Sequence, residues 1–306
     1  MTRKPAFWVT LAVLGLAGAI LAVRLFPVAF PLLSVDIEMD REGALSQARD
    51  LAQQFDWDPG EFRQAASFGH LDPAFQTYME LEGGGLEDLN RLLGEGTLTI
   101  YAWRVRHFAE ETVEESEIRF TPSGIRHGFR LVLSEDTPGR NLGANEAREA
   151  AVQEGALEWG IDPGRYELLE SSQEEQPSGR VDHTFVFEHS DFQPGEARVR
   201  LRLGVAGDRL VEVTHFFHVP EGFLRRYQET RNANESVSLA GTIVFLIFFL
   251  ILGGGAGTVH LLRKRWIEWK VPLAWGAVVA GLMALGSINT LPLSWMGYNT
   301  AIPAQV

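Results

Sequence analysis

Apolar residues without any charge are concentrated in three runs near the two ends of the chain, at 6–23, 239–259 and 271–291. Each run is close to the roughly 20 residues that a helix needs to cross about 30 Å of hydrocarbon. The pattern therefore predicts three membrane helices. We expect the first to end at Val23, because an arginine at mid-membrane, here Arg24, costs about 2.5–3.5 kcal/mol. A cleaved signal peptide is the alternative for this run, but its apolar stretch is long for one and favours an uncleaved anchor.

Between these runs the pattern changes to helical and strand-like segments. Residues 40–55 carry apolar side chains at spacings of three and four, with Asp40 as the expected N-cap, and 145–159 repeat this design with Asn145 as the cap. β-formers dominate four later segments, and the last of them alternates clearly enough to predict an antiparallel hairpin. The four segments are 97–108, 117–133, 182–187 and 197–219.

A short motif occurs twice, as FDWDPGEFRQA at 55–65 and as WGIDPGRYELL at 159–169. Each copy follows a predicted helix and precedes strand-like sequence. Proline disfavours helix in the residue before it, and glycine supplies turn conformations. We interpret both Asp-Pro-Gly turns as junctions between helix and sheet, with a ligand site as the alternative. The sequence thus predicts an α+β fold, in which tandem helix-plus-antiparallel-meander repeats outside the membrane are joined to three transmembrane α-helices.

Six segments are expected along the chain. Because each repeat has its own helix and strands, we also expect the second repeat to fold without the first. The segments are a cytoplasmic start and anchor helix at 1–35, a first repeat at 36–141 with an insert at 69–96, a second repeat at 142–220, a helical stalk at 221–238, a transmembrane hairpin at 239–291 with a cytoplasmic loop at 260–270, and an outer tail at 292–306. The tail is uncharged, and we expect it to be truncated.

The distribution of charge predicts the orientation in the membrane. All three lysines lie either at position 4 or in the loop 260–270, and basic segments remain on the cytoplasmic side. The chain is therefore expected in a bacterial inner membrane, with residues 36–236 on the extracytoplasmic side. These residues hold all but one of the 40 acidic residues. This acidity argues against nucleic acid as a partner, since phosphates require cationic surfaces. The expected partners are the lipid bilayer and a peptide or membrane-protein substrate.

Three polar patterns were considered as sites. EESEIR at 114–119 fits E-E-x-x-x-R and FVFEH at 185–189 fits F-x-x-x-H, two patterns of intramembrane glutamic endopeptidases, but in those enzymes the residues lie on membrane helices. His215 and His218 of HFFH are three positions apart, so on a strand they face opposite sides and do not easily share a metal. We predict no catalytic, cofactor-binding or metal-binding residue in this chain. Glu114 and Glu115 are therefore not expected to be catalytic.

Small residues in the predicted hairpin form a fourth pattern. GGGAG at 253–257 and the pair Gly276 and Ala280 have the small-x-x-x-small spacing that allows membrane helices to approach closely. We therefore expect the second and third membrane helices to pack through these residues.

The whole arrangement resembles the amino-terminal half of bacterial CPBP-family proteins, the CAAX-protease and bacteriocin-processing-like intramembrane endopeptidases. The resemblance is carried by the stalk VPEGFLRRYQETRNANE at 219–235 and by the basic loop with Trp266 and Trp269. It implies a non-catalytic region whose outer domain presents or gates substrate for a downstream membrane active site. The family's catalytic motifs are absent from this chain, so no catalytic residue is carried over and enzymatic activity stays open.

The helix-plus-meander repeats are also similar to PepSY-type modules. The alternative function, from a different class, is a complete membrane-anchored sensor or scaffold that binds a peptide or protein partner through its extracytoplasmic α+β domain.

Overall fold

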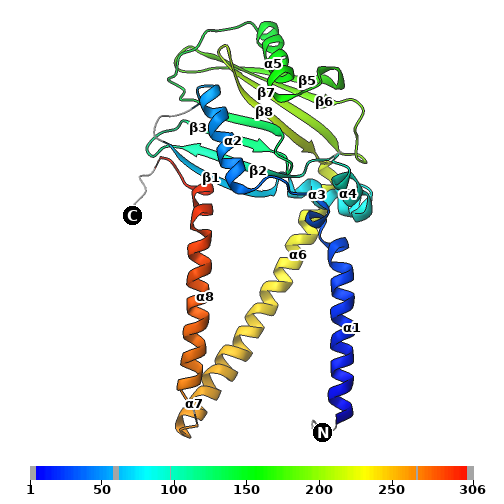
Figure 1. Ribbon diagram of the computed structural model, residues 1–306, viewed down its shortest axis with the longest axis vertical. Coiled ribbons are helices and arrows are strands. Elements are labelled where there is room, and N and C mark those ends of the chain that lie inside the picture. Colours follow the sequence, from blue (N-terminus) through cyan, green and yellow to red (C-terminus); the bar gives the residue numbers. More distant parts are fainter. Residues whose placement is uncertain (1–4, 58–61, 97, 267, 302–306) are drawn as a thin grey trace. The chain divides into compact units, whose positions relative to one another are not determined.

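The computed structural model describes residues 5–57, 62–96, 98–266 and 268–301, so the first Asp-Pro-Gly turn, at 58–60, and Glu61 lie outside the described residues. The fold combines helices with an antiparallel sheet, which confirms the predicted α+β class (Figure 1). The chain divides into two compact units, Met1–Val219 with Trp295–Val306, and Pro220–Ser294. We describe each unit by itself.

One eight-stranded antiparallel sheet forms the centre of the first unit, in the order β1-β2-β3-β4-β8-β7-β6-β5. The two meanders, β1 to β4 and β5 to β8, are joined where β4 pairs with β8 through Phe129 and Val213. The two repeats therefore share one sheet. The strands are β1 (Arg63–His70), β2 (Tyr101–Phe108), β3 (Glu115–Phe120), β4 (Arg126–Val132), β5 (Tyr166–Glu175), β6 (Val181–His189), β7 (Arg198–Ala206) and β8 (Arg209–His218).

One helix from each repeat packs on the sheet. Helix α2 (Arg41–Gln54) contacts β1, β2 and β3, and α5 (Ala144–Trp159) contacts β4, β6, β7 and β8. Asp40 caps α2 as predicted, because its carboxylate accepts a hydrogen bond from the Gly43 amide at 2.7 Å. The predicted cap at Asn145 is wrong, since Gly143 occupies the N-cap position of α5.

The C-terminus of α5 is formed by a glycine and not by the Asp-Pro-Gly turn. Gly160 adopts the left-handed conformation with φ of 65°, which ends the helix before the turn begins. Asp162 then accepts a hydrogen bond from the Gly164 amide at 3.1 Å and starts the short helix η2 (Pro163–Arg165). The second turn is thus a structural junction between α5 and β5.

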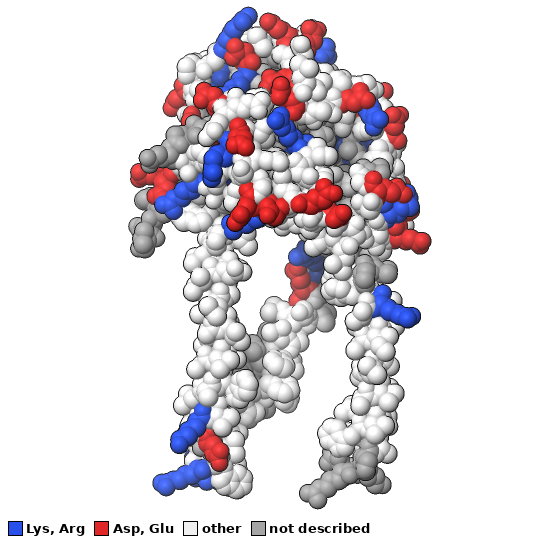
Figure 2. Space-filling view, in the orientation of Figure 1, with Lys and Arg blue, Asp and Glu red and all other residues white. Residues whose placement is uncertain are grey.

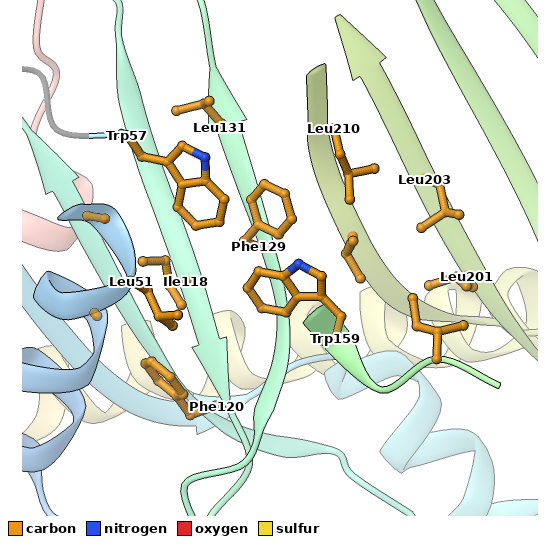
Figure 3. Packing of buried hydrophobic residues seen from close by; sticks show 14 of the residues in the cluster. Leu51, Trp57, Ile118, Phe120, Phe129, Leu131, Trp159, Leu201, Leu203 and Leu210 are labelled. Carbon is orange, nitrogen blue, oxygen red and sulfur yellow. The ribbon is translucent and has the colours of Figure 1, made fainter. Parts of the chain in front are cut away.

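The core of this unit is continuous across both repeats. Trp57, which follows α2, and Trp159, at the end of α5, stack on Phe129 of β4 with ring centroids 4.2 and 4.6 Å apart (Figure 3). Phe129 is completely buried, and the two indoles are 5% and 6% exposed. Since β4 belongs to the first repeat, its central aromatic side chain is covered from both repeats.

The insert of the first repeat forms two helices, α3 (Pro73–Leu81) and α4 (Gly85–Gly94). Asp72 caps α3 by accepting hydrogen bonds from the amides of Ala74 and Phe75. The Phe75 ring stacks on Phe217 of β8 with centroids 3.8 Å apart. The insert therefore packs against a strand of the second repeat.

Among the described residues, three helical segments are long and apolar enough to cross a membrane, at 6–26, 221–263 and 270–297. The first lies in α1 (Pro5–Ala29), so the predicted end at Val23 is wrong, and the helix continues through Arg24. A long arginine side chain can extend its charge toward the membrane surface without interrupting the helix. The short helix η1 (Pro31–Ser34) follows.

The second unit contains α6 (Glu221–Phe245), the π-helical segment η3 (Leu246–Ala256), α7 (Gly257–Arg263) and α8 (Lys270–Ser294). A Cβ built on Gly257 or Gly276 meets no atom within 4 Å, so the predicted close packing is not found at these glycines. We call the part of the first unit built around the eight-stranded sheet the sheet domain. In the view of Figure 2 the charged side chains are crowded on this domain, and the membrane-length helices carry few on the face shown.

A histidine cavity at the joint between the repeats

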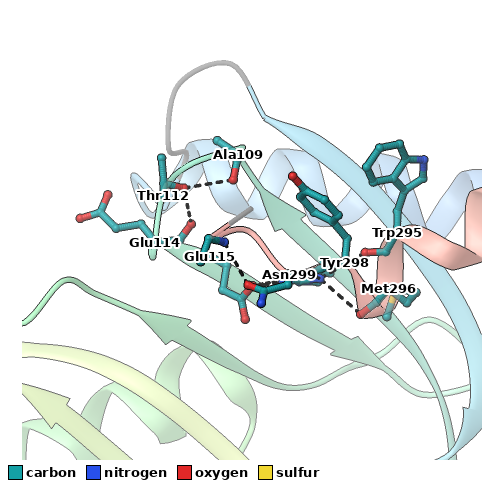
Figure 4. A network of polar contacts seen from close by, with 10 residues as sticks. Ala109, Thr112, Glu114, Glu115, Trp295, Met296, Tyr298 and Asn299 are labelled. Carbon is teal, nitrogen blue, oxygen red and sulfur yellow. Dashed lines mark hydrogen bonds and ion pairs between the residues drawn. The ribbon is translucent and has the colours of Figure 1, made fainter. Parts of the chain in front are cut away.

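The carboxylates of the E-E-x-x-x-R pattern lie at the start of β3, where the described contact is an ion pair within the sheet domain. Glu115 begins β3 and forms an ion pair with Arg106 of β2, and Glu114 lies in the preceding loop. Arg106 Nη1 also donates to the carbonyl oxygens of Trp295, Met296 and Tyr298, the last at 2.8 Å. Figure 4 shows these carbonyl-bearing residues of the C-terminal segment beside Glu115.

The two histidines of HFFH lie on opposite faces of β8, as the strand period predicts. His215 pairs across the sheet with Leu201, a buried core residue, and directly opposed side chains share a face. His218 is exposed. The neighbour of His215 is instead His127 of β4, a residue outside the three sequence patterns.

His127 and His215 form a stacked pair across the β4–β8 joint. Their ring centroids are 4.7 Å apart and their planes are inclined by 25°. His215 Nδ1 lies 3.0 Å from the His127 carbonyl oxygen, which can only accept, so Nδ1 carries the proton. His127 Nε2 is buried without a hydrogen-bond partner in the described part of the chain.

The backbones of β4 and β8 approach closely beside this pair. A Cβ built on Gly128 would lie 2.2 Å from the Val213 carbonyl oxygen, a distance that real side chains do not reach. Glycine is therefore required next to His127 for the two strands to join. The pair sits at the point where the two repeats are held together.

A cavity of about 490 Å³ opens beside the histidine pair and contains a third histidine. His189, the last residue of the F-x-x-x-H pattern, accepts hydrogen bonds at Nδ1 from the amides of Asp191 and Phe192. Its ring meets Tyr166 edge-on at 5.0 Å. The cavity is lined by Leu98, Thr99, His127, Arg165, Tyr166, His189, Asp191, Phe192, Val199, His215 and Phe217.

Desolvation disfavours the charged form of both imidazoles in the stacked pair, although each residue is only half-buried. Desolvation is the main cause that lowers the pKa of His127 well below its ordinary value, and His215 and Arg119 add to it. Desolvation also lowers the pKa of His215, opposed by its hydrogen bond to His127 and assisted by Arg119 and His189. Burial raises the pKa of the Tyr166 hydroxyl, which Arg165 partly offsets. The stacked pair and Tyr166 therefore present uncharged imidazole and phenol groups to the cavity at neutral pH.

Comparison with known proteins gives no family. No protein-family model and no curated protein matches this chain. Among solved structures it is similar to the Bacillus megaterium YpeB C-terminal domain, with a TM-score of 0.33 and 11% sequence identity. The match covers 58% of this chain and 63% of the YpeB chain, so it spans less than two thirds of that structure. The CPBP resemblance gains no support from the family and curated comparisons.

The structure thus brings together two histidines from patterns that were set aside, His189 and His215, and adds His127. Within the described ranges, no group of three or more His, Cys, Asp or Glu side chains has an arrangement that would hold a metal ion. The neutral, stacked imidazoles can instead take up protons when the pH falls.

Proposed function

We propose that this chain is a membrane-anchored sensor whose sheet domain, outside the cytoplasm, responds to acid at the His127–His215 pair. The observation that carries the proposal is the position of this pair across the β4–β8 joint, where it connects the two repeats. A proton taken up there places a charge in a half-buried site between the strands. The joint should then loosen.

The direction of the pH dependence follows from the lowered pKa values. In the unfolded chain both imidazoles are protonated as the pH falls through about 6.5, whereas in the folded chain they are protonated only at lower pH. Between these values the unfolded state binds more protons, so stability is complete above about pH 6.5 and is lost as the pH falls.

The cations that face the pair make its protonated state unfavourable. Arg119 of β3 is a nearby cation, and His189 of β6 joins it when protonated. Arg165 and Asp191 line the same cavity. From β8, only Val219 and Pro220 separate the strand from α6, which is a membrane-length helix.

Hydrogen–deuterium exchange of the full chain in lipid nanodiscs tests this response. Between neutral pH and about pH 5, exchange in β4 and β8 should rise by more than the change in intrinsic rate. The double variant His127→Phe/His215→Phe should lose most of this extra exchange, and His218→Phe, an exposed position in the same strand, should keep it. An unchanged acid response in the double variant would contradict the proposal.

The acid response of His107, a buried histidine outside the joint, must be separated from that of the pair. Burial, and secondarily Arg49, lowers the pKa of His107 to about 4, so it also reduces stability in acid. His107 belongs to β2, away from the joint, and its ring contacts Phe62. Its effect should remain in the double variant and should be centred on β2.

The proposed orientation places the sheet domain outside and the loop 260–270 inside. The basic residues support it, as does the contact of the segment after α8 with Arg106 of the sheet domain. The chain has no native cysteine, so single cysteines can report it. In intact cells a membrane-impermeant maleimide should label Asn145→Cys and leave Lys264→Cys unlabelled. Labelling of Lys264→Cys without lysis would reverse the orientation.

The stalk and basic hairpin favour a second candidate, the non-catalytic part of a CPBP-like protease that presents or gates substrate. Its E-E-x-x-x-R residues lie on the sheet domain, where Arg119 pairs with Glu117 at 2.7 Å. The coding sequence beyond Val306 distinguishes the candidates. Further membrane helices that carry paired glutamates and histidines would favour the protease.

A further inference from the structure

The two edges of the sheet differ in how they are covered. At the first edge, Arg63 of β1 lies over the Trp295 ring, 4.5 Å from its centroid, and β1 contacts the short helix η4 (Trp295–Gly297). At the second edge, every residue of β5 after Tyr166 is exposed. β5 pairs with β6 on one side, and in the described part of the chain no strand pairs with its other side.

An exposed edge strand offers a row of backbone donors and acceptors to another extended segment. β5 contains no proline, so each residue keeps its amide. Its register shifts between Leu168 and Glu170, which leaves the regular part of the strand at 170–175. This length is close to that of an ordinary strand.

Three acidic side chains lie along one face of β5, where Ser172 occupies the position between Glu170 and Glu174. Glu167, Glu170 and Glu174 lie opposite Glu188, Val186 and Asp182 of β6, on the face away from the core residues Phe185 and Phe187. Glu188 and Asp182 are neutralised by arginines of the same domain. The three β5 carboxylates form no ion pair with any described residue, and a strand added to this edge would place every second side chain beside them.

A hollow beside the strand adds a second feature. It has a volume of about 600 Å³ and extends from β5 across β6 and β7 to β8. Glu170 stands at its β5 side and Glu212 at its β8 side, where Glu212 is 3.7 Å from Arg202. A long cationic side chain from an added strand can lie in this hollow and reach the Glu170 carboxylate.

We propose that β5 is a docking strand for an extended protein segment that carries Lys or Arg at every second position. A second copy of this chain fits the edge poorly, because antiparallel pairing of two β5 strands would bring carboxylates against carboxylates. The partner's backbone pairs with the free edge, and its cations face Glu167, Glu170 and Glu174. This docking is independent of the acid response.

The probe is a fluorescent peptide of about eight residues in which lysine and valine alternate, added to the full chain in phosphatidylcholine nanodiscs. Binding should protect the amides of 166–175 from exchange. A peptide with N-methyl groups on alternate residues keeps the charges but cannot form the ladder, and it should not bind. Equal binding of the methylated peptide would mean simple charge attraction and would overturn the proposal.

Charge-reversal variants test whether the β5 carboxylates bind the cationic peptide. Glu170→Arg/Glu174→Arg should weaken binding roughly tenfold or more. Glu42→Arg/Glu149→Arg changes the net charge equally at exposed helical positions and should weaken it no more than about twofold. Equal loss in both variants, absence of binding, or protection only outside 166–175 would overturn the proposal. Concentration-dependent protection of 166–175 without peptide would assign the edge to a second copy instead.

Discussion

Replacing Phe129 by alanine is expected to lower the unfolding free energy of the sheet domain by about 3–5 kcal/mol, the usual cost of truncating a buried aromatic side chain. Phe129 has no exposed surface and is stacked between Trp57 and Trp159, so its removal leaves a cavity lined by both repeats. Domains are typically stable by about 5–15 kcal/mol, so much of the folded population is at risk. Thermal unfolding of the chain in nanodiscs measures the effect.

The control is Leu157→Ala, a large apolar side chain on α5 that is 75% exposed. It should shift the melting temperature of the sheet domain by only a few degrees at most. Trp57→Ala and Trp159→Ala should both destabilise strongly, and their double-mutant cycle should show coupling, since the indole centroids are 6.2 Å apart. Independent, additive effects would mean that each repeat has its own core.

Separating the two repeats is expected to unfold both, although the sequence predicts that the second folds alone. The boundary at 141/142 remains a prediction, but the structure shows one sheet and one core across it. Without the first repeat, β8 loses its partner β4, and Trp159 loses Phe129. Arg209 also loses the carbonyl oxygens of Phe55 and Asp56, each at 2.7 Å.

Circular dichroism of the segments 36–141 and 142–219, alone and mixed, tests this expectation. Neither segment should unfold cooperatively alone, and the mixture should regain a cooperative transition. A cooperative transition of the second segment by itself would restore the independent repeat that the sequence predicts.

The strands that the sequence predicts are those with one buried face. The alternation of 197–219 corresponds to β7 and β8, where Leu201, Leu203 and Val213 are buried. β5 was missed because an edge strand exposed along its length needs no apolar alternation, and its sequence YELLESSQEE has little. A local sequence pattern reveals a strand when one of its faces is buried, and β5 has almost no buried residue.

The candidate site was predictable only in part. The period of a strand correctly separates His215 from His218, but the partnership of His215 with His127 depends on the pairing of β4 with β8. These two residues are 88 positions apart, and the pairing that unites them is a property of the whole sheet. Gly128 was the available signal, since glycine inside a strand marks close backbone approach.

Titration of the histidine rings by NMR tests the acid response most directly. The full chain with labelled histidine in nanodiscs gives a signal for each imidazole, and His127→Phe and His215→Phe assign the two at the joint. His127 should remain neutral well below the ordinary imidazole pKa, and the pKa of His215 should also lie below that value. Protonation of the two rings should coincide with increased exchange in β4 and β8. A midpoint near pH 6.5 for both rings, with the joint intact after protonation, would contradict the account.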